Sequence, residues 1–136
     1  MISLLKAWLR TLPALLLLHT LGCVTPIPPV TSEQIASADY GTVPVTPTYQ
    51  DAIKHYMREI LFDPHTAHYR FVEEPRRGYA YISGTKEPPA FGYLVQVEIK
   101  AKNLMGRYMG EQPYRFFIKN ERLYMLDKSV KAEVVQ

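Results

Sequence analysis

The strongest pattern along the chain is a change in hydrophobic period near residue 63. Before it, apolar side chains recur at helical spacing and polar ones fill the opposite side. Thr48 and Asp51 are spaced as in a capping box, and Pro47 suits a first helical turn. Pro64 disfavours helical geometry just before it, so we expect an amphipathic helix from Thr48 to about Phe62. Its apolar stripe consists of Tyr49, Ile53, Tyr56, Met57 and Ile60.

After Pro64 the period becomes two, which is typical of strands that bury one face. The clearest alternation covers residues 91–102. Its apolar side holds Tyr93, Val95, Val97, Ile99 and Ala101, and its polar side holds Gln96, Glu98, Lys100 and Lys102. Shorter runs predict further strands over 68–72, 78–83, 114–118 and 122–126, with a tight connection at 119–121. We expect the tail from Asp127 to fray, with the packing of Val130 back onto the domain as the alternative.

These elements predict an α+β domain over residues 48–136, with one amphipathic helix packed on a four- to five-stranded antiparallel sheet. The helix stripe should cover one face of the sheet. The predicted core consists of Tyr49, Ile53, Met57, Val95, Val97, Ile99, Phe116 and Ile118.

The first 22 residues have the order of a signal peptide. Lys6 and Arg10 supply positive charge, the apolar run from Leu12 to Leu18 follows, and Gly22 is a small residue at the end. The apolar run is much shorter than the ~20 residues that span a bilayer. Without this segment the chain has 14 basic and 13 acidic residues, so its charge gives no argument for nucleic-acid binding.

The sequence Leu21-Gly22-Cys23 resembles the lipobox of bacterial lipoproteins. The resemblance implies that the leader is cut before Cys23 and that the Cys23 thiol carries a lipid that anchors the chain in a membrane. Val24 stands where an inner-membrane retention signal would place aspartate, which implies the outer membrane. The alternative is an ordinary secretory leader, with a secreted periplasmic accessory protein that carries no lipid. Residues 23–47 include five prolines and predict a proline-rich linker.

The body brings a second resemblance, which extends over most of residues 49–125. An Asp-Pro-x-x-Ala-x-Tyr-x-Phe stretch begins at Asp63, and an Ala-Lys-Asn motif begins at Ala101. Gly92-Tyr93, Gly106 and a Pro-Tyr-x-Phe strand from Pro113 complete the likeness. These motifs resemble a group of small proteobacterial envelope lipoproteins of uncharacterised function. The resemblance supports the α+β architecture and implies no catalytic residues.

Candidate chemistry is sparse. Asp63, His65 and His68, with His55 two turns earlier, have donor types that suit zinc, but no second cluster completes a four-ligand set. A small metal-binding protein is therefore a minor alternative. The sequence has no nucleophile elbow and no glycine-rich phosphate loop, so we expect no enzyme and no cofactor.

A basic, tyrosine-dotted surface is the main candidate for binding. Its members are Lys100, Lys102, Arg107, Tyr108, Arg115 and Lys119. If these residues share the outer face of the sheet, they suit lipopolysaccharide, peptidoglycan carboxylates or an acidic envelope protein. The alternative is a solvated face whose lysines protect the sheet against edge pairing.

Overall fold

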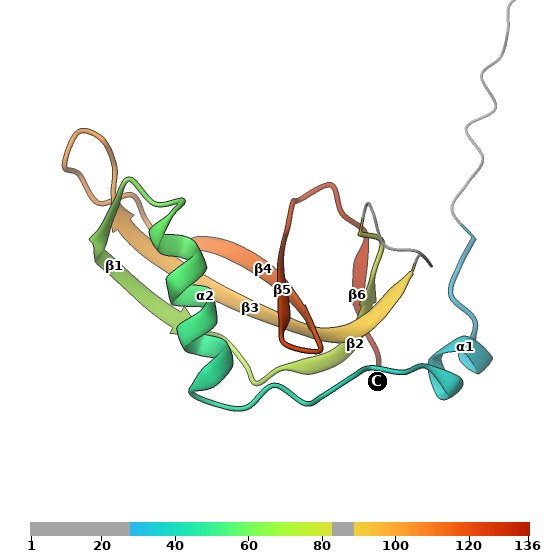
Figure 1. The fold of residues 1–136 in the computed structure, drawn as a ribbon. Coiled ribbons are helices and arrows are strands. Elements are labelled where there is room, and N and C mark those ends of the chain that lie inside the picture. Colours follow the sequence, from blue (N-terminus) through green and yellow to red (C-terminus); the bar gives the residue numbers. More distant parts are fainter. Residues whose placement is uncertain (1–27, 83–88) are drawn as a thin grey trace, which may run out of the picture.

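A computed structural model describes residues 28–82 and 89–136 (Figure 1). The predicted signal peptide, Cys23 and the end of the expected strand 78–83 lie outside the described residues. Two helices are present, α1 (Ser32–Ser37) and α2 (Thr48–Arg58). The strands are β1 (Asp63–Phe71), β2 (Arg76–Ala80), β3 (Ala90–Lys102), β4 (Gln112–Lys119), β5 (Arg122–Leu126) and β6 (Ala132–Val134).

The strands form one antiparallel sheet in the order β5-β4-β3-β2-β6, and β1 also pairs with β3. The 13-residue strand β3 is long enough to take two partners along one side. Its first part pairs with β2 and its last part with β1. A hydrogen bond from the Val72 amide to the Gln96 carbonyl (3.1 Å) lies between the two pairings. The architecture is therefore α+β as predicted, with six strands in the sheet.

The ends of α2 differ from the sequence prediction. The helix begins at Thr48, but Pro47 is the N-cap residue and makes no side-chain hydrogen bond. The expected capping box therefore does not form, and Asp51 instead lies 3.5 Å from the Lys54 ammonium. The helix ends at Arg58 rather than near Phe62, because the next amides fold back onto the carbonyls of its last turn.

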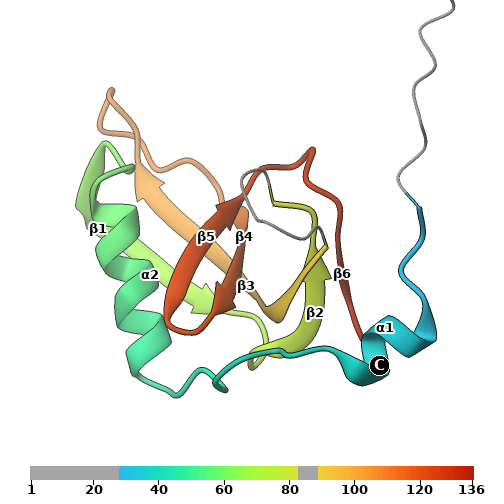
Figure 2. The same ribbon diagram turned by 45° about the vertical axis from the view of Figure 1, so that its right-hand side comes forward.

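The main core lies between α2 and the sheet. All the predicted core residues are buried there, together with Tyr93. Ile53, Met57, Val97 and Phe116 have no exposed surface. Figure 2 shows α2 lying across one face of the sheet. The two hydrophobic periods in the sequence therefore identify this core correctly.

A second cluster lies on the opposite face, where the sequence predicted a basic binding surface or a solvated face and no apolar core. Ala80, Phe117 and Leu126 are buried in it, and Val130 packs against them. Strand β6 pairs with β2, and the Tyr79 hydroxyl donates a hydrogen bond to the Glu133 carboxylate. The expectation that the tail frays is therefore wrong, and the alternative, in which Val130 packs back onto the domain, is confirmed.

Part of the expected linker contacts the domain. The Lys119 ammonium donates to the Asp39 carbonyl (2.9 Å), and the Thr42 amide donates to Asn120 Oδ1 (3.3 Å). The Tyr40 ring packs edge-on against Phe91, with ring centroids 5.8 Å apart. Residues 39–42 thus run along the β4–β5 turn, in which Asn120 and Glu121 both have positive φ, as the predicted tight connection requires.

We expect Ile53→Ala to lower the free energy of unfolding by about 2–5 kcal/mol, because it leaves a cavity between α2 and the sheet. Ile60→Ala is the matched control, since Ile60 is 44% exposed just beyond the same helix. It should cost less than about 1 kcal/mol. Urea unfolding followed by circular dichroism compares the two. Equal losses would contradict the core assignment.

The Tyr79–Glu133 hydrogen bond predicts an alkaline stability effect. The hydrogen bond to Glu133, with burial, raises the pKa of Tyr79 from 10.0 to about 12. The folded state therefore holds this proton more tightly than the unfolded chain. The contribution is complete below pH 10.0 and is lost as the pH rises through about 12.

Tyr79→Phe should therefore lower stability by about 1 kcal/mol at neutral pH. Its deficit relative to the parent should shrink as the pH rises through this range. Glu133→Gln keeps an acceptor without the negative charge, so it should bring the Tyr79 pKa back toward its ordinary value. Urea unfolding as a function of pH measures both effects. A stability deficit that stays constant with pH would contradict the assignment.

Candidate functional site

Three of the six residues predicted for the binding surface come together at the end of β3, and a fourth, Arg107, is next to them in the chain. The Lys100 and Lys102 ammonium groups each lie 5.4 Å from the centroid of the Tyr108 ring. Arg107 precedes this tyrosine in the β3–β4 loop and is exposed. We call Lys100, Lys102, Arg107 and Tyr108 the basic–tyrosine surface. Both lysines project from the side of β3 opposite α2, as the alternation predicted.

Asn103 organises the loop that carries Tyr108. Its side-chain oxygen accepts hydrogen bonds from the amides of Met105 (2.9 Å) and Arg107 (3.1 Å). The backbone amide of Asn103 donates a hydrogen bond to the backbone carbonyl of Arg107 (2.9 Å). Gly106, with φ of 71°, provides the left-handed turn between them. Tyr108 then forms a β-bridge with Lys102, so the loop folds back and places its ring beside the lysines.

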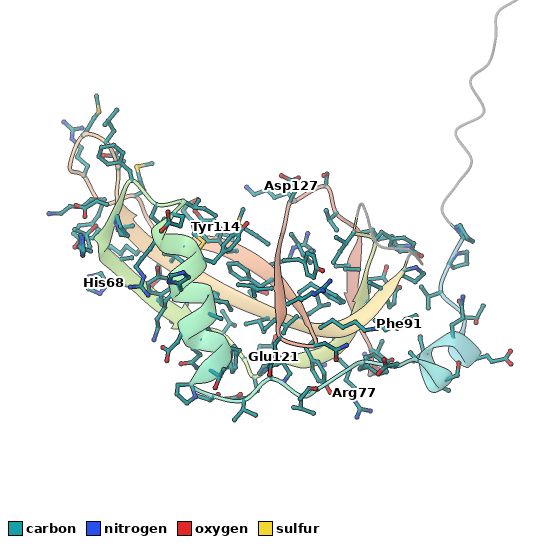
Figure 3. The ribbon with its side chains drawn as sticks, viewed as in Figure 1. His68, Arg77, Phe91, Tyr114, Glu121 and Asp127 are labelled. Carbon is teal, nitrogen blue, oxygen red and sulfur yellow. The ribbon has the colours of Figure 1, made fainter. Side chains whose placement is uncertain are left out.

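His68 also lies at this surface, although its sequence pattern indicated only a metal-ligand candidate. His68 pairs with Lys100 across β1 and β3, and its ring centroid lies 6.1 Å from that of Tyr108. Figure 3 shows it on the β1 side of the sheet. Its position in an alternating strand was a usable signal, but the partner strand was not known from the sequence.

The positive charges of the basic–tyrosine surface are not neutralised by ion pairs with any of the described residues. Within residues 28–82 and 89–136, no acidic side chain forms a salt bridge with its lysines or its arginine. Two of the nearby acids, Glu98 and Glu111, pair with Arg70 instead. Cations above a tyrosine face gain a modest attraction from the ring while staying accessible.

Arg115 and Lys119, the other two predicted residues, lie elsewhere. The Arg115 guanidinium donates to the carbonyls of Asp127 (3.1 Å) and Val130 (3.2 Å) and so holds the β5–β6 loop. Lys119 binds the Asp39 carbonyl beside the β4–β5 turn. Figure 3 shows Asp127 well apart from His68. These two cations therefore support the fold and do not extend the basic–tyrosine surface.

The β5–β6 loop is ordered by local hydrogen bonds as well. The backbone amide and the hydroxyl of Ser129 both donate to the Asp127 carboxylate, at 2.9 and 2.8 Å. These hydrogen bonds hold the pKa of Asp127 below its usual value. Together with Arg115 they give the loop a fixed shape.

The residues considered for a metal site do not converge. Asp63 pairs with Lys102 and His68 with Lys100, and the register shifts between them. In the part of the chain that the structure describes, no three His, Cys, Asp or Glu side chains lie close enough together to hold a metal ion.

Comparison of the chain with protein-family models, with curated proteins and with solved structures finds no match. The resemblance to envelope lipoproteins therefore stays a prediction. Of the helices in the described residues, none has the length and apolar character needed to cross a bilayer.

The free energy of unfolding distinguishes the cations that support the fold, such as Arg115, from those of the basic–tyrosine surface, such as Lys100. Arg115→Ala should lower the free energy of unfolding by about 1.5–3 kcal/mol, because a charged donor to two carbonyls is lost. Lys100→Ala is the control and should change it by no more than about 0.5 kcal/mol. Hydrogen exchange at the Val130 amide, which bonds to the Asp127 carbonyl, should accelerate only in the arginine variant. Similar effects of both substitutions would contradict the distinction.

Proposed function

We propose that this chain is a lipid-anchored bacterial envelope protein whose small α+β domain faces the periplasm. Cys23 is the anchor residue, and residues 1–22 are the leader that processing removes. The outer membrane is the proposed destination, on the resemblance at Val24. The order of leader, cysteine, proline-rich segment and compact domain supports this reading.

The domain binds or scaffolds an anionic envelope component and does not catalyse a reaction. The observation that carries this proposal is the basic–tyrosine surface, whose cations form no salt bridge among the described residues. Unpaired lysines and an arginine around an aromatic ring attract carboxylates or phosphates and steer their approach. Negatively charged lipids, peptidoglycan carboxylates and acidic proteins share this chemistry.

Cys23→Ser tests the anchor. The substitution removes the thiol that would carry lipid, so the chain should leave the membrane fraction, or stay uncut at a larger size. Fractionation with mass measurement and labelling by a radioactive fatty acid provide the readouts. Val24→Asp is the matched control, because it leaves the thiol in place and should still be labelled and pellet with membranes. A Cys23→Ser chain that matures at the parent's size and still pellets with membranes would exclude lipidation.

A further inference from the structure

The end of the molecule that carries the β3–β4 loop exposes an unusual amount of apolar surface. Leu104 is 74% exposed, Met105 80% and Met109 50%. Scattered exposed apolar residues are common, but a group on one loop indicates an interaction site.

The chain before β1 adds to this apolar end. Phe62 is 65% exposed, and the next residue, Asp63, pairs with Lys102 immediately before the loop. Figures 1 and 2 both show the turn between α2 and β1 beside the β3–β4 loop, which projects beyond the sheet. Phe62, Leu104, Met105 and Met109 therefore lie at the same end of the sheet, and we call this group the apolar tip.

The basic–tyrosine surface lies directly behind this tip. Lys100 and Lys102 are the last residues of β3 on its outer side, and Arg107 lies within the loop itself. The acids of this end are Glu59, Asp63, Glu98 and Glu111, and the last two pair with Arg70. An apolar projection with cations behind it is complementary to a bilayer with anionic headgroups. Apolar side chains suit the acyl boundary, tyrosine suits the interface, and lysines reach the phosphates.

We propose that this apolar tip is a second membrane contact, which inserts into the surface of an anionic lipid bilayer while Lys100, Lys102 and Arg107 bind the lipid phosphates. The inference deepens the proposed function by naming lipid as the anionic component, and it rests on an envelope location. The contact itself does not depend on the Cys23 lipid.

The shape of the tip favours a bilayer over a protein partner. A Cβ atom at Gly106 or at Gly110 would have no described atom within 4 Å, so the space around both glycines is open. A protein interface usually places its anchors in pockets of matching shape. A bilayer accepts a projecting apolar loop without a matching pocket.

Tryptophan placed in the loop tests the contact. Trp8 is the chain's only tryptophan and lies in the predicted leader, so the parent protein measures any background. The full chain with Met105→Trp is mixed with phosphatidylcholine vesicles containing phosphatidylglycerol, whose acyl chains carry bromine as a quencher. Val134→Trp is the control, because β6 lies toward the other end of β3. We expect quenching at position 105 to exceed that at position 134 at least about twofold. Equal quenching, or none at 105, overturns the proposal.

Charge reversal tests the role of the lysines. In the Cys23→Ser, Met105→Trp chain, Lys100→Glu with Lys102→Glu should raise the lipid concentration for half-maximal quenching at least about tenfold. Each basic residue near an anionic surface contributes about fivefold in affinity. Lys54→Glu with Lys128→Glu makes the same charge change elsewhere and should have a much smaller effect. Equal effects of both pairs overturn the proposal, as does a crosslink from position 105 to an envelope protein without lipid quenching.

The outcomes separate this inference from the proposed anchor. If Cys23→Ser abolishes membrane fractionation but position 105 is never quenched, only the inference fails. If Cys23→Ser leaves fractionation and size unchanged while anionic vesicles quench position 105, the lipid anchor fails and the membrane contact stands.

Discussion

The packing of α2 on strand β3 is the interaction on which the rest of the structure depends. The apolar side of β3 lies beneath α2, and its side chains there are buried: Tyr93, Val95, Val97 and Ile99. Because side chains alternate along a strand, this burial forces Gln96, Lys100 and their neighbours to the opposite face. A one-residue shift in register would move every side chain of β3 to the other face of the sheet. The core therefore fixes the register, and with it the face from which the two lysines project. The binding surface is in this sense a consequence of the core.

The sequence predicts this part of the fold well because both patterns are local. The hydrophobic period of a helix, 3.6 residues, and that of a strand, 2 residues, can each be recognised within a single segment. The packing of the helix on the sheet then follows from their apolar sides. The failures concern features that depend on distant partners. Strand β6 is held by pairing with β2 and by the bond between Tyr79 and Glu133, which are 54 residues apart. A three-residue strand is too short to show an alternating pattern, so the tail gives no sign of such a partner.

The candidate binding surface also depends on distant contacts that the sequence pattern does not show. Lys100, Arg115 and Lys119 all point away from the main core, so alternation alone assigns them to one face. Position along the strand then separates them, because β4 runs from the loop end of β3 toward its start. Arg115 meets the β5–β6 loop and Lys119 meets residue Asp39 before α2. The alternation of side chains along a strand predicts the face from which each cation projects. Which cations remain available to bind a ligand is decided by contacts with the chain segments that cross that face.

The proposed lipid anchor and the apolar tip complement each other energetically. A lipid at Cys23 would hold the domain close to the bilayer, which raises the effective concentration of the tip at the surface. A tip of a few apolar side chains with three cations then needs only modest affinity of its own. Asn103 contributes by fixing the loop, because a preordered loop loses less conformational freedom on insertion than a flexible one. Two weak constraints at separate points would fix the orientation of the domain as well as its location, which a single flexible anchor cannot do.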